Sequence, residues 1–443
     1  MKVFVVGNGG REHAIAWKLA QSELVEEVLC APGNGGTTFE NKCANVLMEN
    51  NDYVAAAKRE GCALAVIGPE NPLAEGLADS FWAAGIPVVG PTKAAAQLEA
   101  SKDLAKEFMN KYGVACAKSR TFTDEKEALA YVESQGAPIV IKADGLAAGK
   151  GVVVAKTLEE AKNAVTELME GNKVGSAGRK LVIEEYLRGD EVSILAAVSV
   201  TADYAKEGKA CIVPFESARD HKRLGDGAQG PNTGGMGAIA PVDDVTPAVW
   251  KQFEERILKP TLRGMIAEGY DYRGFIFFGL MLTAEGPKCL EYNVRLGDPE
   301  TQAVLPLMDF DFAALCEAIV TGTLSSFPVA WKKGYVVAPV AVSGGYPGEY
   351  KKGFPIVVHK EQFEKSGAKL FVAGAIEDRR ADRSREKEVT GLITNGGRVL
   401  ACSAFGKSFD EARKKAYEAL DCIHFNGMFY RKDIGLPGAA ASD

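Results

Sequence analysis

The first hundred residues alternate short apolar runs with helical patterns, and this alternation constrains the fold more than any other feature of the chain. Each run ends at a glycine or a proline, as expected for buried parallel strands. The runs are Val3–Val6, Val28–Ala31, Leu64–Ile67 and Pro87–Val89, with helical patterns between them at Glu12–Gln21 and Asn71–Ala84. This order predicts a doubly wound parallel sheet, on which ligands bind beyond the carboxyl ends of the strands. Residues 7–11, 32–36 and 68–71 therefore belong to the expected binding edge.

The middle of the chain has a different order of elements. We expect helices at 92–111, 124–134 and 158–169, and strands at 138–142, 151–155, 180–186 and 191–200. Residues 120–190 then form a compact α+β unit, which we interpret as a mobile lid. The polar, glycine-rich stretch at 214–240 has neither helical nor strand period, so we expect it to be irregular.

The remainder of the chain predicts a helix at 249–267, a hairpin of strands 275–283 and 288–295, and a smaller α+β unit. That last unit has strands near 336–342, 370–373 and 398–401 and a helix at 409–420. The predicted fold class is thus α/β and α+β multidomain. We place the domains at 1–103, 104–328 and 329–443.

Composition excludes several classes of protein. The net charge of -7 argues against a nucleic-acid-binding surface, because binding to a phosphate backbone requires a basic face. The nine cysteines include no C-x-x-C pair, so neither a zinc site nor a disulfide framework is expected. No apolar run approaches the length of a membrane span, and no signal peptide precedes the first strand. We therefore expect a cytoplasmic enzyme.

A phosphate site is predicted at 142–151, where the sequence reads KADGLAAGKG. Lys142 ends an apolar strand, so its ammonium group can meet phosphate oxygens. Gly145, Gly149 and Gly151 let the backbone approach a ligand without a Cβ clash. The spacing differs from that of a Walker A loop. The alternative is an ordinary hairpin with an exposed lysine, but three glycines and two lysines exceed what a hairpin needs.

A metal site is predicted on the strand that ends near residue 295. Glu291, Asn293 and Arg295 alternate, so a strand would present all three on one face. A carboxylate and an amide oxygen are suitable ligands for Mg²⁺. An arginine beside them can hold a carboxylate or a phosphoryl group through two hydrogen bonds. The alternative is an exposed polar face without a ligand.

Three weaker patterns complete the candidates. Glu184, Glu185, Tyr186 and Leu187, with Glu191, end an apolar strand and could bind adenine and ribose, although such acids usually face solvent. The turn with Gly9, Gly10 and Arg11 suggests a phosphate or ribose cradle, or simply a tight turn. Asp220–Arg223 and the glycine-rich Pro231–Gly237 suggest an anion site, or a flexible surface loop.

Together and in this order, these motifs resemble the ATP-grasp superfamily and, within it, the phosphoribosylamine–glycine ligase family. The motifs that carry the resemblance span nearly the whole chain: GNGGREHA at 7–14, GPENPL at 68–73, KADGLAAGKGV at 142–152, DHKR at 220–223, GPNTGGMGA at 230–238, E-x-N-x-R-x-GDPETQ at 291–302, NGGRVL at 395–400 and RKDIG at 431–435.

The resemblance implies an N-terminal substrate domain, an ATP-grasp core with a lid and a small C-terminal domain. It implies that Lys102 and Lys142 contact ATP phosphates, that Glu184–Leu187 hold adenine and Glu191 the ribose, and that Glu291 and Asn293 bind Mg²⁺ or Mn²⁺. Phosphoribosylamine would be surrounded by Gly9, Gly10, Arg11, Glu70, Lys222, Asn232, Thr233, Asp298 and Glu300. Arg295, with Asp220, would bind glycine, and Arg295 and Lys142 would be the catalytic cations.

The implied reaction joins glycine to 5-phosphoribosylamine at the expense of ATP, through a glycyl phosphate, in de novo purine biosynthesis. We expect small-molecule substrates only, no nucleic acid or membrane partner, and a monomer. Three alternatives remain open at this point. They are another ATP-grasp carboxylate–amine ligase acting on a different ribonucleotide, a nucleotide-binding protein without turnover, and a nicotinamide oxidoreductase. The last is disfavoured because Glu12 occupies the third glycine position of the dinucleotide fingerprint.

Overall fold

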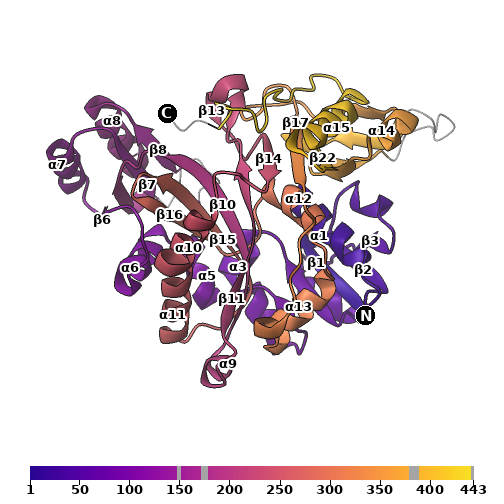
Figure 1. The fold of residues 1–443 in the computed structure, drawn as a ribbon, viewed down its shortest axis with the longest axis horizontal. Coiled ribbons are helices and arrows are strands. Elements are labelled where there is room, and N and C mark those ends of the chain that lie inside the picture. Colours follow the sequence, from indigo (N-terminus) through magenta and orange to yellow (C-terminus); the bar gives the residue numbers. More distant parts are fainter. Residues whose placement is uncertain (147–150, 171–177, 379–388, 441–443) are drawn as a thin grey trace.

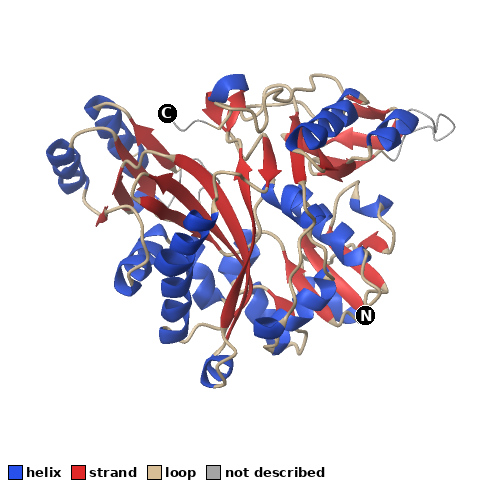
Figure 2. Ribbon diagram, in the orientation of Figure 1, coloured by secondary structure: helices blue, strands red, loops and turns tan. Residues whose placement is uncertain are grey.

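The computed structural model describes residues 1–146, 151–170, 178–378 and 389–440. Figure 1 shows the N-terminal sheet at the lower right, the C-terminal elements at the upper right and the predicted lid at the left of a long central sheet. Figure 2 shows helices against the sheets of each part. Among the described residues, no helix is long and apolar enough to cross a membrane.

The N-terminal sheet is parallel, with the order β3-β2-β1-β4-β5. Its strands are β1 Lys2–Gly7, β2 Glu27–Pro32, β3 Cys43–Asn45, β4 Leu64–Ile67 and β5 Val88–Val89. Its helices are α1 Gly10–Ala20, α2 Tyr53–Arg59, α3 Glu70–Glu75 and α4 Leu77–Ala83. The predicted doubly wound sheet is confirmed. The short strand β3, which the sequence analysis did not predict, extends it at one edge.

The predicted lid is a four-stranded antiparallel sheet with its own hydrophobic core. Its order is β6-β9-β7-β8, from β6 Ser119–Phe122, β7 Ile139–Ala143, β8 Val152–Ala155 and β9 Leu181–Glu185. Helices α7 Glu125–Gln135 and α8 Leu158–Met169 pack on it. Phe122, Val132, Ile141 and Val165 belong to a buried cluster separate from the main core. This unit therefore has a core of its own, and its mobility as a lid stays a prediction.

One eight-stranded sheet runs through the rest of the molecule in the order β16-β15-β10-β11-β14-β17-β22-β19. The strands are β10 Asp190–Val200, β11 Cys211–Asp220, β14 Gly237–Ala240, β15 Tyr272–Thr283, β16 Gly286–Asn293, β17 Tyr335–Val342, β19 Lys369–Val372 and β22 Arg398–Gly406. The helices of this region are α5 Lys93–Ala100, α6 Lys102–Tyr112, α9 Ala202–Lys206, α10 Pro247–Phe253, a π-helical turn Glu254–Leu258, α11 Lys259–Ala267, α12 Glu300–Val304 and α13 Phe312–Thr321. The sheet continues across residue 328, so β17 and β22 contribute Val337, Val340 and Ala401 to the main core.

A second, four-stranded sheet lies near the C-terminus in the order β20-β21-β18-β23. It is formed by β18 Pro355–Val358, β20 Ala375–Glu377, β21 Val389–Thr394 and β23 Ile423–His424, with helices α14 Lys360–Ser366 and α15 Phe409–Asp421.

Three expected elements differ substantially from the structure. Residues 214–240, expected to be irregular, contain most of β11, the hairpin β12 Arg223–Gly225 and β13 Gln229–Asn232, and β14. The expected helix 92–111 divides at Ser101, whose hydroxyl caps α6 by accepting from the Leu104 N–H at 3.1 Å. The expected helix 71–84 divides at Gly76, whose φ of 96° is left-handed.

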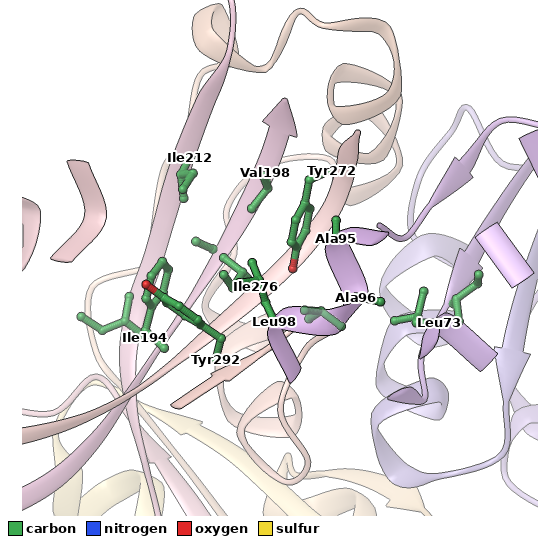
Figure 3. Close-up of a cluster of buried hydrophobic side chains, with 14 of the residues drawn as sticks. Leu73, Ala95, Ala96, Leu98, Ile194, Val198, Ile212, Tyr272, Ile276 and Tyr292 are labelled. Carbon is green, nitrogen blue, oxygen red and sulfur yellow. The ribbon is translucent and has the colours of Figure 1, made fainter. Parts of the chain in front are cut away.

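The main core joins the N-terminal part to the long sheet. Figure 3 shows Leu73 of α3 and Ala95, Ala96 and Leu98 of α5 beside strands of the long sheet. The sheet residues of this cluster include Ile194, Val198, Tyr272, Ile276 and Tyr292. The Tyr292 hydroxyl shares a 2.7 Å hydrogen bond with Thr261, which satisfies it inside this core. Helix α5 is thereby fixed against β16, and the two elements form one wall of the site described next.

Candidate active site

A cavity of about 310 Å³ lies between the lid and the long sheet. The lid contributes β7, β8 and β9, and the opposite wall consists of the start of α3, α5, α6 and the end of β16 with the turn that follows it. The structure brings together nine of the residues predicted from sequence: Glu70, Lys102, Lys142, Gly145, Gly151, Glu184, Glu291, Asn293 and Arg295. They are separated by up to 225 residues in the chain, so the fold rather than sequence proximity assembles them.

Two lysines share one buried carboxylate on the lid side. Glu184 contacts Lys142 at 3.0 Å and Lys106 at 3.2 Å, and all three side chains are buried. Burial acts to lower the pKa of Lys142, but the carboxylates of Glu184 and Glu291 outweigh it and leave that pKa above its ordinary value. Lys142 is therefore cationic at neutral pH. An anion entering the cavity meets a charge that is already held in place.

Lys102 projects from the first turn of α6 and donates to the carbonyl of Gly145 at 2.7 Å. Burial lowers the pKa of Lys102, against the opposing attraction of Glu291. Its hydrogen bond ties α6 to the lid strand that carries Lys142. Both predicted phosphate-binding lysines thus face one space, together with Gly145 and Gly151.

Glu291 lies opposite these lysines. Burial acts to raise its pKa, but Lys222, Lys142, Lys102 and Arg295 outweigh it, so the pKa is lower than usual and the group is a carboxylate. Asn293 donates its amide N–H to the Tyr292 carbonyl at 2.9 Å, which leaves its side-chain oxygen as an acceptor. The two oxygens suit a hard cation. No group of three or more His, Cys, Asp or Glu that could hold a metal ion by itself occurs among the described residues, so other ligands would have to complete the coordination.

Arg295 lies two residues beyond β16, not on the strand as predicted, because β16 ends at Asn293. It nevertheless lines the same cavity. Its guanidinium contacts Glu99 of α5 at 2.9 Å and Glu70 of α3 at 3.4 Å. Glu99 is buried and also accepts from the Val294 N–H at 2.7 Å. The turn after β16 is therefore fastened to α5.

A second group of predicted residues lies at the carboxyl edge of the N-terminal sheet. Asp298 forms a 3.0 Å ion pair with Arg398 and accepts from Gln302 at 2.7 Å. Burial acts to raise the pKa of Asp298, but Arg398 and Arg11 outweigh it and lower that pKa. A Cβ at Gly9 would lie 3.4 Å from an Asp298 oxygen, so the glycine-rich turn directly faces this acid. The Gly9 N–H is donated to Glu12 at 2.6 Å.

The same edge holds the rest of that turn. Arg11 is buried and donates to the Leu296 carbonyl at 3.1 Å, so it lies beside the turn that carries Asp298. A Cβ at Gly10 would come within 2.6 Å of the Gln302 amide. Gly10 thus allows α1 to approach α12 closely.

A third group of predicted residues connects the cavity to the group around Asp298. Lys222 forms an ion pair with Glu191, whose attraction is the main cause of the raised pKa of this lysine; Glu291 and Asp220 add to it. Burial, followed by the nearby charge of Glu300, raises the pKa of Asp220. Glu300 accepts from Ser193 at 3.0 Å. The Asp220 Oδ1 atom is buried without a hydrogen-bond partner among the described residues, which is the state expected of a group that meets a ligand.

Several predicted residues lie away from the cavity lining. Glu185 accepts from the Lys118 N–H at 2.9 Å, and Leu187 packs with Ala117 and Met281. Tyr186, which lies between these two residues in the sequence, is half-buried and does not line the cavity. The predicted pair Asn232 and Thr233 sits on the β11–β14 connection, with Asn232 exposed and Thr233 donating to the Lys222 carbonyl at 2.8 Å. The predicted Gly149 lies outside the described residues.

Three charged residues of the site had no predicted role: Glu99, Lys106 and Arg398. Lys106 follows Lys102 by four residues on α6, so helical spacing could have indicated it. Arg398 belongs to the NGGRVL motif. This motif was part of the family resemblance, but no role was predicted for its residues. Glu99 lies in an alanine-rich helix with no local signal; only tertiary contact identifies it.

Comparisons with known proteins follow the same three-part organisation. Models of the phosphoribosylglycinamide synthetase N domain, ATP-grasp (A) domain and C domain match residues 1–99, 100–301 and 336–437. The phosphoribosylamine–glycine ligase of Clostridium acetobutylicum is 48% identical over 437 residues, covering 98% of this chain and 99% of that protein. This chain belongs to the phosphoribosylglycinamide synthetase family. The ligase of Escherichia coli K12 is 46% identical over 440 residues, covering 98% of each.

Solved structures agree with the family assignment. The phosphoribosylamine–glycine ligase of Thermotoga maritima matches with a TM-score of 0.82 and 37% identity, covering 98% of this chain and 100% of that one. The biotin carboxylase domain of the Hydrogenobacter thermophilus 2-oxoglutarate carboxylase has a TM-score of 0.69 at 16% identity, covers 97% of this chain and 91% of that one, and shares the fold alone. The family and fold predicted from the motifs are confirmed.

Proposed function

We propose that this protein ligates glycine to 5-phosphoribosylamine, with ATP as the energy source, to give glycinamide ribonucleotide, ADP and phosphate in de novo purine biosynthesis. The observation that carries the proposal is full-length similarity to phosphoribosylamine–glycine ligases. The cavity supports it, because Lys102, Lys142 and Arg295 gather three cationic side chains around one carboxylate, Glu291.

The proposed reaction has two steps. The glycine carboxylate attacks the γ-phosphorus of ATP, the bond to the leaving oxygen of ADP breaks, and glycyl phosphate forms. The amine of phosphoribosylamine then attacks the acyl carbon, phosphate leaves, and the nitrogen loses a proton. Phosphoryl transfer depends mainly on positioning and electrostatic stabilisation, and the cations Lys142 and Arg295 provide the latter. The lid excludes water from the acyl phosphate.

We assign the ligand positions that the family resemblance implies, and the three groups of residues support most of them. We assign the ATP phosphates to Lys102, Lys142, Gly145 and Gly151, the adenine to the strand end Glu184–Leu187 and the ribose to Glu191. Glu291 and Asn293 would hold Mg²⁺ or Mn²⁺, and the phosphate oxygens of ATP would complete the coordination; when bound, the metal neutralises phosphate charge. Phosphoribosylamine is assigned to the edge formed by Gly9, Gly10, Arg11, Glu70, Lys222, Asn232, Thr233, Asp298 and Glu300. Glycine is assigned to Arg295 and Asp220, between the other two ligands.

Domain boundaries, compartment and assembly are further parts of the proposal. We place the substrate domain at 1–103, the ATP-grasp domain at 104–328 and the C-terminal domain at 329–443. All nine cysteines are free thiols, which suits a reducing compartment such as the cytoplasm. A monomer is proposed, and light scattering during size-exclusion chromatography measures it directly.

The deciding experiment measures ADP and glycinamide ribonucleotide formed by the purified protein from Mg-ATP and glycine. Phosphoribosylamine is generated in the assay from ribose 5-phosphate and ammonia. We expect both products only when all three substrates are present. ADP formation with a different amine, and none with phosphoribosylamine, would instead support another carboxylate–amine ligase.

A further inference from the structure

The connection between β11 and β14, residues 221–236, is held by side chains and backbone groups from the far end of the chain. These groups belong to Tyr346, Arg398, Arg431, Lys432, Asp433 and Gly435, which we call the C-terminal clasp. All of its members except Tyr346 lie in the NGGRVL and RKDIG motifs, to which the proposed function gives no role. All contacts in the following paragraphs join residues that the structure describes.

Arg431 is the centre of the clasp. Its side chain has 0% exposure, and its Nε and Nη2 atoms both pair with Asp433 at 2.8 Å. Nη1 donates to the carbonyl of Arg223 at 3.0 Å, and Nη2 also donates to the carbonyl of Ala439 at 2.6 Å. A fully buried guanidinium is stable only when its donors are satisfied in this way. Arg431 thus fixes β12 against the C-terminal segment.

The RKDIG segment makes three more contacts with the first half of the connection. Asp433 accepts from the Gly227 N–H at 2.7 Å, and the Lys432 N–H donates to Asp226 at 2.8 Å. The Gly435 N–H donates to Nε2 of His221 at 2.9 Å. Because that nitrogen accepts, His221 is neutral and its Nδ1–H donates to the Gly237 carbonyl at 3.1 Å.

The second half of the connection is held at Gly234. Its N–H donates to the Tyr346 hydroxyl at 2.9 Å, and its carbonyl accepts from Arg398 at 2.6 Å. The same guanidinium donates to the Asp298 carbonyl at 2.8 Å and pairs with the Asp298 carboxylate at 3.0 Å. Arg398 therefore joins the connection to the turn that faces Gly9.

Residues assigned to substrate lie between these points of attachment. Lys222 is flanked by His221 and Arg223, and Asn232 and Thr233 are followed at once by Gly234. The segment itself is rich in glycine and polar residues and contributes little to a hydrophobic core. Without the clasp, such a segment would have many accessible conformations. With it, Lys222, Asn232 and Thr233 lie between fixed points, one of which is joined to Asp298 through Arg398.

We infer that Arg431 and Arg398 are positioning residues that hold residues 221–236 in the shape that binds the amino-sugar phosphate substrate. This inference rests on the proposed function. It assigns to the C-terminal domain a role in substrate affinity, exerted through the connection and without contact between Arg431 and the substrate. The residues assigned to the ATP phosphates and the metal lie on the lid, α6 and β16, and no hydrogen bond or ion pair joins them to the clasp among the described residues; the connection reaches the ATP site through the Lys222–Glu191 pair.

The test compares Arg431→Gln, Arg398→Gln and Tyr346→Phe with the matched control Arg413→Gln. Arg413 also binds the C-terminal segment, at the Lys432 carbonyl, yet has no contact with residues 221–236 in the described structure. We expect the KM for phosphoribosylamine to rise by about tenfold in the two arginine variants, and the KM for ATP to stay within about twofold. Hydrogen exchange in peptides from 221–236 should become faster, while the control retains wild-type values.

Conservative variants and the wild type make the outcomes distinguishable. Arg431→Lys cannot pair with Asp433 through two parallel bonds, so it should recover only part of the affinity. If Arg431→Gln does not fold, Tyr346→Phe removes a single acceptor at Gly234 and tests the same connection. Equal KM values and equal exchange in folded variants would overturn the inference while wild-type turnover upholds the proposed function. A wild type that forms no glycinamide ribonucleotide would overturn both.

Discussion

At the scale of single residues, the site is made of charges that are already paired before a ligand arrives. Lys142 contacts Glu184, Arg295 contacts Glu99 and Glu70, and Asp298 contacts Arg398. Each pair holds a side chain in place in a buried region, where an unpaired charge is strongly destabilising. When a nucleotide binds, these side chains would exchange their present partners for the nucleotide, and they would need to move little.

Replacing Lys142 tests the phosphate assignment. In Lys142→Ala we expect kcat/KM for ATP to fall by about 100-fold, because a buried cation that faces the transferred phosphoryl group is lost. Glu184 keeps its contact with Lys106, so the protein should remain folded. The measurement is steady-state kinetics with varied ATP. Lys126→Ala, an exposed lysine on α7 of the same lid, is the control, and unchanged ATP kinetics in Lys142→Ala would remove this residue from the site.

Replacing Glu291 tests the metal assignment. Glu291→Gln keeps the size of the side chain but removes its charge, so we expect the Mg²⁺ concentration for half-maximal activity to rise by about tenfold or more. The measurement is a Mg²⁺ titration at fixed ATP. Glu285→Gln changes an exposed glutamate in the turn of the same hairpin and should titrate as the wild type does. Identical titrations for both variants would contradict the role of Glu291.

The candidate site residues could be predicted because each has a chemical type that suits its proposed ligand. The partners that hold them could not. Glu99 occupies an alanine-rich helix, and its contact with Arg295 spans 196 residues. Arg398 reaches Asp298 across 100 residues. The local sequence pattern indicates which residues carry functional groups. The neighbours of those residues depend on how distant elements pack together.

At the scale of elements, the predictions succeeded where hydrophobic period was strong and failed where polar and glycine residues obscured it. Strand β4 is buried at every position and was predicted residue for residue. Strand β14 is GAIA, and its pairing with β17 lies about 100 residues away in sequence, so nothing local marks it. The division of α5 from α6 depends on a single capping hydroxyl at Ser101, inside a pattern that otherwise reads as one helix.

The β11–β14 connection carries a prediction about pH. Burial and then the nearby Arg431 lower the pKa of His221 to about 4, from an ordinary value of 6.5. Between these values the unfolded chain binds more protons than the folded protein does, so the free energy of unfolding falls as the pH falls. From pH 7 to pH 5 this group should account for a loss of about 2 kcal/mol.

The comparison of His221→Gln with the wild type isolates that effect. Glutamine can accept from the Gly435 N–H but does not titrate, so the variant should lose about 2 kcal/mol less stability between pH 7 and pH 5. Urea unfolding at the two pH values measures it. His424→Gln, at an exposed position, should behave as the wild type does. Parallel losses in all three proteins would show that His221 is not the group that titrates.

At the scale of the whole molecule, the long sheet links the central part of the chain to its C-terminal part, while the lid has a sheet of its own. Strands β17, β22 and β19 extend the sheet that begins with β16, so C-terminal residues such as Arg398 reach the site along one continuous element (Figure 1). The lid has a separate hydrophobic core. Its contacts with the rest of the cavity wall are largely polar, as between Glu184 of the lid and Lys106 of α6, or between Lys142 of the lid and the Leu290 carbonyl of β16.

This division predicts how a nucleotide changes the dynamics of the protein. A ligand that contacts Lys142 on the lid and Lys102 and Glu291 on the other wall stabilises only the closed arrangement, so it suppresses separate opening of the lid. With a non-hydrolysable Mg-ATP analogue at about 100 times its Kd, amide exchange in β7 and β9 should slow by up to about 100-fold. Hydrogen exchange followed by mass spectrometry measures this, with β1 of the N-terminal sheet as the internal reference because its amides are protected by a core that the nucleotide does not touch. Equal slowing of β1 and β7 would mean that the ligand stabilises the molecule as one unit. No slowing in either strand, at a concentration shown by calorimetry to saturate the protein, would mean that the lid carries none of the binding energy and that the phosphates are held by α6 and β16 alone.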